Sequence, residues 1–355
     1  MRRATPSACS PQRPSRRSLL AGALGVTGMA LTGCQVRLED SAPELPFIPT
    51  REPIPAEDAL LWLLRDCREL ASHDQPESGL SVVGLYEEQV AVLRTALYRA
   101  GIPVETLDET PVEPMPQGTS TSATRTSTPA QPEPTTPADP TAVPTQATEP
   151  PASPSATRAD DGAAAALRRL PELAQCGGGL FPLVISLLAQ RWATLAVGGI
   201  EIPGEAVQAD PARLWGLPFL AGPFARLTDA ARYGFEVVAA QSRDSAREVA
   251  LEALWRINAL WREQNIRSGG RAPAPELGYP LPFPVNSEES AERLATHVID
   301  GLIDGYAGLL TDMVGTAQEE TSVDLVAWLG SAVAIGTQWG IPIEAFPGTR
   351  APSAP

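Results

Sequence analysis

The amino-acid sequence predicts an all-α protein, and three observations support this prediction. Apolar residues recur every three or four positions through several long segments, which is the spacing of one buried helix face. No segment of useful length alternates apolar and polar residues as a half-buried strand would. A long tract rich in Pro, Thr and Ser separates the helical segments into two groups. We therefore expect an N-terminal helical unit and a C-terminal helical domain.

The first 33 residues have the features of an export signal. Arginines precede a short apolar run, Leu19 to Leu31, and no acidic residue occurs before Glu39. The run holds about a dozen residues, whereas a membrane-spanning helix needs about 20. The pair Arg16 and Arg17 resembles the twin-arginine export motif. We therefore expect residues 1–33 to be a signal peptide.

The signal ends in a candidate lipid-attachment motif. Residues 31–34 are Leu-Thr-Gly-Cys, the pattern of a bacterial lipobox, whose cysteine is diacylated and becomes the first residue after cleavage. Two acyl chains hold a protein stably on a bilayer, whereas one does so only marginally. We expect Cys34 to anchor the chain on the outer face of the cell membrane, with the Pro-rich residues 34–55 as a tether. The alternative is an ordinary signal with a chance cysteine.

The charge of the chain restricts its partners. Removal of residues 1–33 leaves 22 basic and 42 acidic residues, a formal charge of −20. This charge argues against nucleic acid and against binding of anionic lipid through a basic patch. We expect contact with the membrane only through the anchor at Cys34, no nucleic-acid partner, and an envelope protein as an open candidate partner.

The N-terminal helical unit is expected to comprise residues 56–101 and 162–200. Its most apolar segment, 180–200, resembles a membrane span, but Gln190 and Arg191 lie at its centre. An arginine at that depth costs about 2.5–3.5 kcal/mol on insertion scales, so we expect a helix buried in protein instead. The other helical segments are 56–73, 78–101 and 163–175.

Residues 102–161 are predicted to be a disordered linker between the two parts of this unit. Their Pro, Thr, Ser and Ala content supplies too little apolar surface to offset the entropy lost on ordering. A stalk or wall-crossing spacer is one interpretation of this tract, and a tolerated loop insertion is the other.

The C-terminal domain is expected to contain four helices, at about 224–242, 244–267, 287–315 and 319–339. The third has the clearest pattern, because seven of its apolar residues follow the spacing of one buried face. These are Ala291, Leu294, Val298, Leu302, Tyr306, Leu309 and Met313.

Four stretches of this domain resemble a known family: ARYGFEVVAA (231–240), YPLPFPVNSEESAERLA (279–295), DGLIDGYAGLL (300–310) and the closing FPG (346–348). On these residues, the segment 213–350 resembles an actinobacterial ferritin-like domain family of unknown function, often carried by exported lipoproteins. The resemblance implies a ferritin-like four-helix bundle with 270–286 as a long connection, and no known activity. Members often carry Glu-His near the start of the first helix, where this chain has Thr228-Asp229.

The long connection also makes sense from its own residues. Prolines at every second position force extended backbone, so Tyr279, Leu281 and Phe283 are expected to alternate as apolar plugs over the bundle. Ser287, with Glu289 or Ser290, is a candidate helix cap. A recognition surface is the alternative role for this loop.

The sequence predicts no metal, cofactor or catalytic residue. A ferritin-like di-metal site needs two Glu-x-x-His pairs, yet the residues three positions before His73 and His297 are leucines. His297, Asp300 and Asp304 share a helix face, which we interpret as solvated, with a metal-ligand set as the alternative. No Gly-x-Ser-x-Gly, P-loop or Gly-x-Gly-x-x-Gly motif occurs.

Three further predictions concern packing and cysteines. Tyr233 and Glu236 are candidate pocket residues inside the bundle, although an edge position for Glu236 is the alternative. The tryptophans, Trp255 and Trp261 among them, are expected to pack in the core or between helices. Cys67 and Cys176 are predicted to form a disulfide, since an exported protein meets an oxidising compartment. Two buried thiols are the alternative, as is a reactive Cys176 near a helix start.

These predictions together describe a membrane-anchored envelope lipoprotein with a metal-free ferritin-like domain. The leading functional hypothesis is a non-catalytic binding or structural module whose ligand the sequence does not name. The alternatives are a carboxylate-based metal-handling protein or enzyme of the ferritin-like class, and an assembly partner for other envelope proteins.

Overall fold

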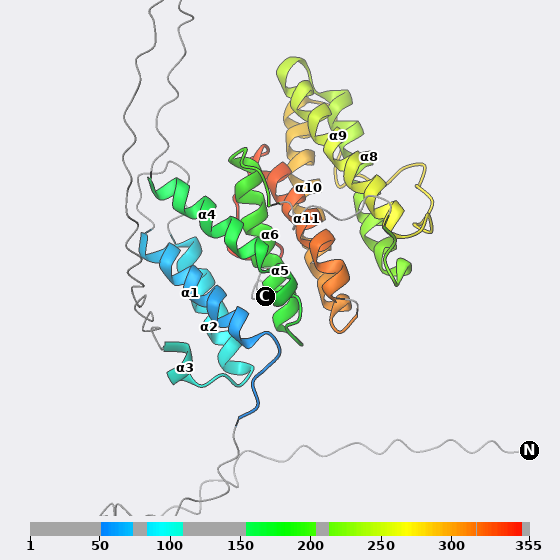
Figure 1. The fold of residues 1–355 in the computed structure, drawn as a ribbon. Coiled ribbons are helices and arrows are strands. Elements are labelled where there is room, and N and C mark those ends of the chain that lie inside the picture. The colour runs from blue at the N-terminus through cyan, green and yellow to red at the C-terminus, as the bar shows by residue number, and fades with distance from the viewer. Residues whose placement is uncertain (1–50, 74–83, 109–153, 204–212, 317, 350–355) are drawn as a thin grey trace, which may run out of the picture. The chain divides into compact units, whose positions relative to one another are not determined.

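The structure, a computed structural model, describes residues 51–73, 84–108, 154–203, 213–316 and 318–349. All regular secondary structure in these ranges is helical, which confirms the all-α prediction (Figure 1). The predicted signal peptide, lipobox and nearly all of the tether lie outside the described residues, in 1–50. Most of the predicted linker, 109–153, also lies outside them.

The N-terminal helices pack around a shared leucine-rich core. α1 lies against α2 and α4, and α4 lies against α6. The apolar face of α1 is buried, with Leu60 and Leu63 at 0% exposure. Two helices reach into the range predicted as linker, α3 at its beginning and α4 at its end. The helices are α1 (Glu57–His73), α2 (Leu85–Arg99), α3 (Val104–Asp108), α4 (Pro154–Arg168), α5 (Leu170–Leu173) and α6 (Leu180–Val197).

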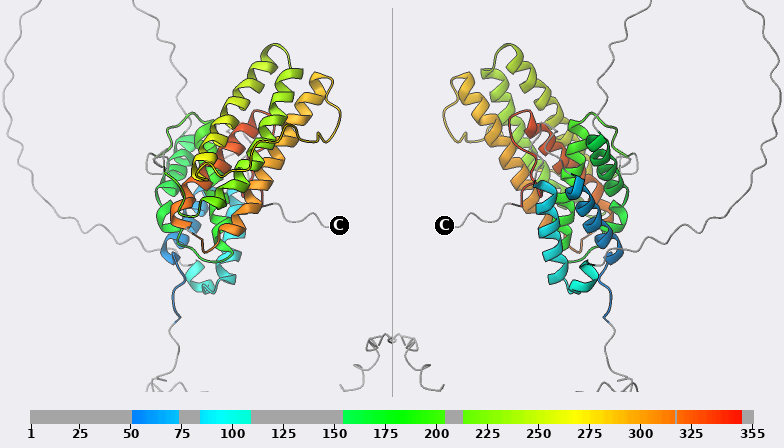
Figure 2. Two further views of the ribbon diagram at one scale, coloured as in Figure 1. Left: turned by 90° about the vertical axis from the view of Figure 1, so that its right-hand side faces the viewer. Right: turned by 90° about the vertical axis from the view of Figure 1, so that its left-hand side faces the viewer.

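The four C-terminal helices form a bundle close to the predicted ranges. α8 packs between α9 and α10, and α11 closes the bundle against α10 and, over a smaller area, α9 (Figure 2). The helices are α8 (Ala221–Gln241), α9 (Asp244–Arg267), α10 (Glu288–Leu310) and α11 (Gln318–Thr337), with short 3₁₀ turns η1 (Pro218–Leu220) and η2 (Thr311–Met313).

Helix α6 joins the two groups of helices because it packs extensively on α11. Among the described helices, α6 alone is long and apolar enough to cross a bilayer, yet 67% of it is buried inside the protein. Gln190 and Arg191 are both buried in it, as expected for a core helix. The approach to α11 is close at Gly330, where a Cβ would come within 2.8 Å of Trp192 and 3.0 Å of the Ala189 carbonyl.

The closing Phe-Pro-Gly segment lies at the same junction. Gln89 of α2 donates a hydrogen bond to the Ala345 carbonyl at 2.9 Å, and Ser186 of α6 donates to the Pro347 carbonyl at 2.7 Å. Gly348 has φ +72° and abuts α10 so closely that no Cβ would fit there. The segment therefore ties α10 to the N-terminal helices.

The connection between α9 and α10 follows the predicted pattern. Tyr279, Leu281 and Phe283 are half-buried, while the prolines between them are exposed. Arg293 of α10 stacks over the Phe283 ring at 4.0 Å. Ser287 caps α10 in a reciprocal capping box with Ser290.

The prediction for Trp255 was wrong. This side chain is 63% exposed on the outer face of α9, because the buried face of that helix is formed instead by residues such as Ala253, Ile257 and Leu260. Trp261 is half-buried and lies under the guanidinium of Arg232 at 5.0 Å.

Candidate functional site

The interior of the bundle contains a closed ring of three neutral polar side chains. Thr228 of α8 donates to Gln264 Oε1 at 2.6 Å, Gln264 Nε2 donates to the Tyr306 hydroxyl at 2.7 Å, and that hydroxyl meets Thr228 Oγ1. Each hydroxyl can then donate once and accept once around the ring. Thr228 and Gln264 are 0% exposed and Tyr306 is 1% exposed, so the ring satisfies polar groups from α8, α9 and α10 without solvent.

Aromatic side chains surround this ring. Phe224 lies 5.5 Å from Tyr306 and 5.4 Å from Trp328 between ring centroids, and Trp215 stacks on Trp328 at 5.1 Å. Burial raises the pKa of Tyr306 to about 12. The hydroxyl therefore keeps its proton at neutral pH and acts as a hydrogen-bond partner, not as an anionic ligand.

One helical turn beyond Gln264, Arg267 forms a buried ion pair with Asp324 of α11. Arg267 Nε lies 2.7 Å from Oδ2 and Nη2 lies 3.2 Å from Oδ1, and both side chains are 1% exposed. Trp215 Nε1 donates to the same Asp324 Oδ2 at 2.6 Å. The carboxylate is thus held by three donors, as a buried charge requires.

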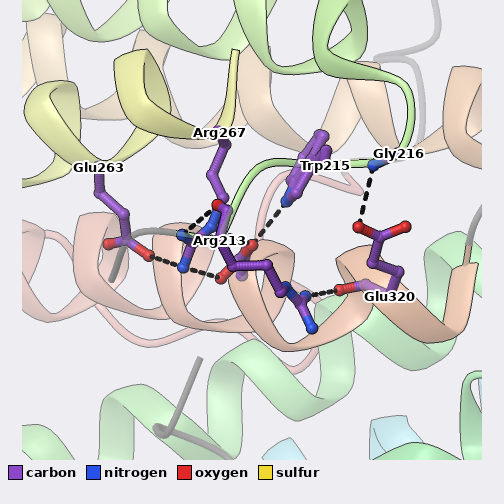
Figure 3. A network of polar contacts seen from close by, with 7 residues as sticks. Arg213, Trp215, Gly216, Glu263, Arg267 and Glu320 are labelled. Carbon is purple, nitrogen blue, oxygen red and sulfur yellow. Dashed lines mark hydrogen bonds and ion pairs between the residues drawn. The ribbon is translucent and has the colours of Figure 1, made fainter. Parts of the chain in front are cut away.

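The segment before α8 is tied to this ion pair and to α11. Arg267 Nη1 donates to the Arg213 carbonyl at 2.7 Å, and Arg213 Nη2 donates to the Glu320 carbonyl. The Glu320 carboxylate accepts from the Gly216 amide at 2.9 Å (Figure 3). Glu263 lies 3.4 Å from Arg267, and its pKa is raised by burial and by Asp324. These contacts hold the segment before α8 against α9 and α11.

A second polar cluster fastens the long connection to α8. The Tyr279 hydroxyl donates to Asp229 Oδ2 at 2.7 Å, and Arg232 Nη2 lies 2.5 Å from Asp229 Oδ1. Tyr233 contacts the Tyr279 ring with centroids 5.9 Å apart. Burial and the neighbouring Asp229 raise the pKa of Tyr279 to about 12, so the contact is a hydrogen bond from a neutral hydroxyl to a carboxylate. We call these four residues the Tyr279 latch.

A third cluster lies among the N-terminal helices, around the fully buried Arg191. Its Nη2 lies 3.4 Å from Asp66 Oδ2 and 3.5 Å from Cys67 Sγ, and its guanidinium stacks over Tyr86 at 4.6 Å. Burial raises the pKa of Asp66 to about 6, an effect that Arg191 opposes only in part. Cys67 Sγ also lies 3.6 Å from Gln89 Oε1. These contacts place a charged group where α1, α2 and α6 meet.

The predicted Cys67–Cys176 disulfide is not present: both residues are buried thiols in the structure. The physical reason is that Cys67 points into the Arg191 cluster, where its sulfur has polar partners of its own. Burial raises the pKa of Cys67 to about 11 and that of Cys176 to about 12. Neither thiol is therefore activated, which also argues against a reactive Cys176.

Glu236 is not a pocket residue, because it is exposed on the outer side of α8. Tyr233, the other candidate, is half-buried and belongs to the Tyr279 latch. His297 and Asp304 are exposed and Asp300 is half-buried. The described residues contain no group of three or more His, Cys, Asp or Glu side chains placed to hold a metal ion. Cys34, Arg16 and Arg17 lie outside the described residues.

The sequence pattern placed Tyr306 on a buried face, but Gln264, Arg267 and Asp324 were missed, although one signal could have found the first two. Gln264 and Arg267 continue the 3–4 spacing of the buried face formed by Ile257 and Leu260. Polar residues in phase with a buried stripe must find partners on neighbouring helices. Asp324 gives a weaker signal, because α11 is apolar around much of its circumference.

Comparison with known families gives one match. The model described as a domain of unknown function, DUF4439, matches residues 226–351. Residues 226–351 thus match this family model, and we refer to them as the DUF4439 domain. It includes most of α8, all of α9, α10 and α11, and the closing Phe-Pro-Gly segment. No curated protein and no solved structure matches the chain significantly.

The DUF4439 domain therefore contains Thr228, Gln264 and Tyr306, together with the Arg267–Asp324 ion pair and the Tyr279 latch. The match begins after Trp215 and Arg213, so these two partners of the ion-pair network come from outside it.

Proposed function

We propose that this protein is an actinobacterial envelope lipoprotein that is exported by the twin-arginine route and anchored at Cys34. In this proposal its DUF4439 domain is a ferritin-like bundle that serves as a non-catalytic binding or structural module. The observation that carries the proposal is the closed Thr228–Gln264–Tyr306 ring, which fills the bundle interior with side chains that satisfy one another.

The arrangement of the helices supports the ferritin-like assignment. Ferritin-like bundles have one long crossover connection among four helices. Here the α9–α10 connection is long, whereas α8 and α9 are joined by only Ser242 and Arg243. The Tyr279 latch fixes that connection on α8.

The core side chains do not fit a di-metal centre of the kind that the ferritin-like class implies. Such a centre takes carboxylates and imidazoles from facing helices. The ring supplies two hydroxyls and an amide in their place, and the two buried carboxylates, Asp229 and Asp324, are each paired with an arginine. No chemical step through a metal is therefore derived for this bundle.

The anchoring part of the proposal rests on the sequence and is tested by fractionation. Cys34→Ala should release the processed protein from the membrane fraction or block its maturation. Replacement of Arg16 and Arg17 by lysines should block export. Membrane retention of a processed Cys34→Ala chain would overturn the lipid anchor, and normal export of the lysine variant would overturn the twin-arginine route.

The metal-handling alternative has one observation in its favour. Glu263 and Asp324 both contact Arg267, so two carboxylates lie at this end of the bundle core, and burial and then Asp324 raise the pKa of Glu263. Elemental analysis of natively purified protein decides between the two functions. We expect no stoichiometric iron or manganese and no change in melting temperature with EDTA. A drop of several degrees with EDTA would favour metal handling.

A further inference from the structure

Helix α9 carries an exposed stripe that runs along the middle of its outer face. Five residues form it, all classed as exposed, and Leu251 and Trp255 are 46% and 63% exposed. At 100° per residue they lie within about 40° of the direction of Trp255. The opposite face of α9 packs against α8 and the rest of the bundle. We call this set the α9 stripe: Glu248, Leu251, Trp255, Ala259 and Arg262.

The order of residues in the α9 stripe is symmetric about Trp255. Glu248 and Arg262 stand seven positions before and after it, and Leu251 and Ala259 stand four positions before and after it. The two ends have opposite charge, and the two intermediate positions pair a large with a small side chain. Trp255 also lies at the middle of the 24-residue helix.

This symmetry has a direct geometric meaning. When two copies of a helix pack antiparallel about a two-fold axis through one residue, positions equally far before and after that residue face each other. The axis through Trp255 places Glu248 opposite the partner's Arg262 at both ends of the contact. It also places Leu251 opposite the partner's Ala259, whose small side chain leaves room for it, and stacks the two Trp255 rings at the centre.

We propose that the α9 stripe is the interface of a two-fold homodimer in which the two α9 helices pack antiparallel. The sequence spacings of three and four residues are those of a helix-packing seam. Nearby charges are compatible with it, because Glu252 and Arg256 at the edge of the stripe form an ion pair within α9 at 2.8 Å. The dimer does not depend on the proposed lipid anchor.

Charge complementarity favours a second copy over a bilayer as the occupant. An anionic lipid surface would repel Glu248 and the acidic chain as a whole, which carries a net charge of −15. The second copy instead supplies an arginine for each Glu248 and a glutamate for each Arg262. One helix pair buries less than the roughly 800 Å² per partner of a standard interface, so the dimer should be weak, with a Kd of about 1–100 µM.

Sedimentation equilibrium of the whole chain carrying Cys34→Ala, so that no acyl chain drives association, measures this dimer. We expect a monomer–dimer equilibrium whose Kd rises at least about tenfold in Trp255→Ala, since buried tryptophans dominate such interfaces. All five positions are exposed, so the variants should fold, which the far-UV circular dichroism melt checks. Glu292→Arg on the exposed face of α10 is the control for the charge variants at Glu248: it makes the same charge change as Glu248→Arg and should leave the Kd unchanged.

A charge swap tests the antiparallel register. Glu248→Arg and Arg262→Glu should each weaken the dimer, because each places like charges opposite one another at both ends. The double variant Glu248→Arg/Arg262→Glu should restore the Kd to within about threefold of the parent, since it rebuilds both pairs. A chain that stays monomeric at all concentrations, or a double variant as weak as the single ones, would overturn the proposal. So would monomers that bind liposomes through Trp255.

Discussion

Arg267 of α9 and Asp324 of α11 form a bidentate ion pair with both side chains 1% exposed. The pair lies one turn from the neutral ring at Gln264 and accepts a further hydrogen bond from Trp215. It joins two helices whose direct contact is otherwise small. The DUF4439 bundle is therefore closed at this corner by charge and hydrogen bonding more than by apolar packing.

The first prediction follows from this closure. Arg267→Met leaves the Asp324 carboxylate buried without its counter-ion and should lower the free energy of unfolding by about 3–5 kcal/mol. The double variant Arg267→Met/Asp324→Leu removes both charges, so its free energy of unfolding should fall by much less. Urea unfolding monitored by circular dichroism measures both values. A double variant no more stable than the single one would contradict this account of the pair.

The second prediction is a pH dependence at Asp66. Burial raises the pKa of its carboxyl to about 6, against about 3.9 in an unfolded chain. The folded protein then holds the proton more tightly, so this contribution to stability is fully present below pH 4 and is lost as the pH rises through 6. Linkage gives it a size of about 2–3 kcal/mol.

Asp66→Asn cannot titrate and isolates this effect. Between pH 4 and pH 7 the free energy of unfolding of the variant should gain about 2–3 kcal/mol relative to that of the parent, as measured by urea unfolding at intermediate pH values. Parallel pH profiles for the two proteins would show that Asp66 titrates normally.

The helices could be predicted because the three-to-four-residue spacing of apolar side chains shows which face of each helix is buried, without knowledge of its neighbours. The limits of α1 and α9 agree with the expected ranges, and so does the cap at Ser287, whereas α10 ends at Leu310, five residues before the expected end of that helix. Partners across helices could not be predicted from one sequence. Cys67 fits a buried stripe equally well as a disulfide half or as a thiol beside Arg191, and only the packing of α1 on α6 decides.

Surface and core tryptophans were confused for a related reason. Trp255 lies seven residues after Glu248 and seven before Arg262, a phase that marks a solvated face. The apolar character of the side chain outweighed its phase in the prediction. Gln264 is the reverse case, since its polar character hid a position in phase with Ile257.

The third prediction concerns the two thiols. Their raised pKa values leave almost no thiolate at pH 8, so alkylation of the folded protein should be slow. In unfolded protein that has not been reduced, both should react at once. Mass spectrometry of the Cys67 and Cys176 peptides measures each site separately. If both peptides react with the alkylating reagent only after reduction, the two cysteines form a disulfide and this prediction is wrong.

The fourth prediction addresses the Tyr279 latch. Tyr279→Phe removes the hydrogen bond to Asp229, which retains Arg232 as its partner, and should cost about 1–2 kcal/mol. Limited proteolysis should then cut the exposed residues 273–278 faster. Tyr233→Phe, which keeps the ring contact with Tyr279, is the control and should leave the cleavage rate unchanged. Equal cleavage rates in all three proteins would mean that the hydroxyl does not hold the connection.

The last prediction tests how the N-terminal helices are coupled to the DUF4439 domain. That coupling depends on the close approach of α6 to α11 at Gly330, where a new Cβ would meet the Trp192 side chain and the Ala189 carbonyl. The backbone carbonyl cannot move aside as a flexible side chain could. Gly330→Ala should therefore lower the free energy of unfolding by about 1–3 kcal/mol, despite the better helix propensity of alanine.

Gly301 of α10 provides a matched control, because a Cβ there meets nothing within 4 Å. Gly301→Ala should stabilise the protein by up to about 1 kcal/mol through helix propensity alone. Urea unfolding followed separately by tryptophan fluorescence and by circular dichroism measures both variants. If Gly330→Ala weakens the α6–α11 contact, the two probes should separate, because the helices on either side then unfold independently. If both variants are stabilised to the same extent, α6 and α11 can move apart without any loss of stability, and this prediction is wrong.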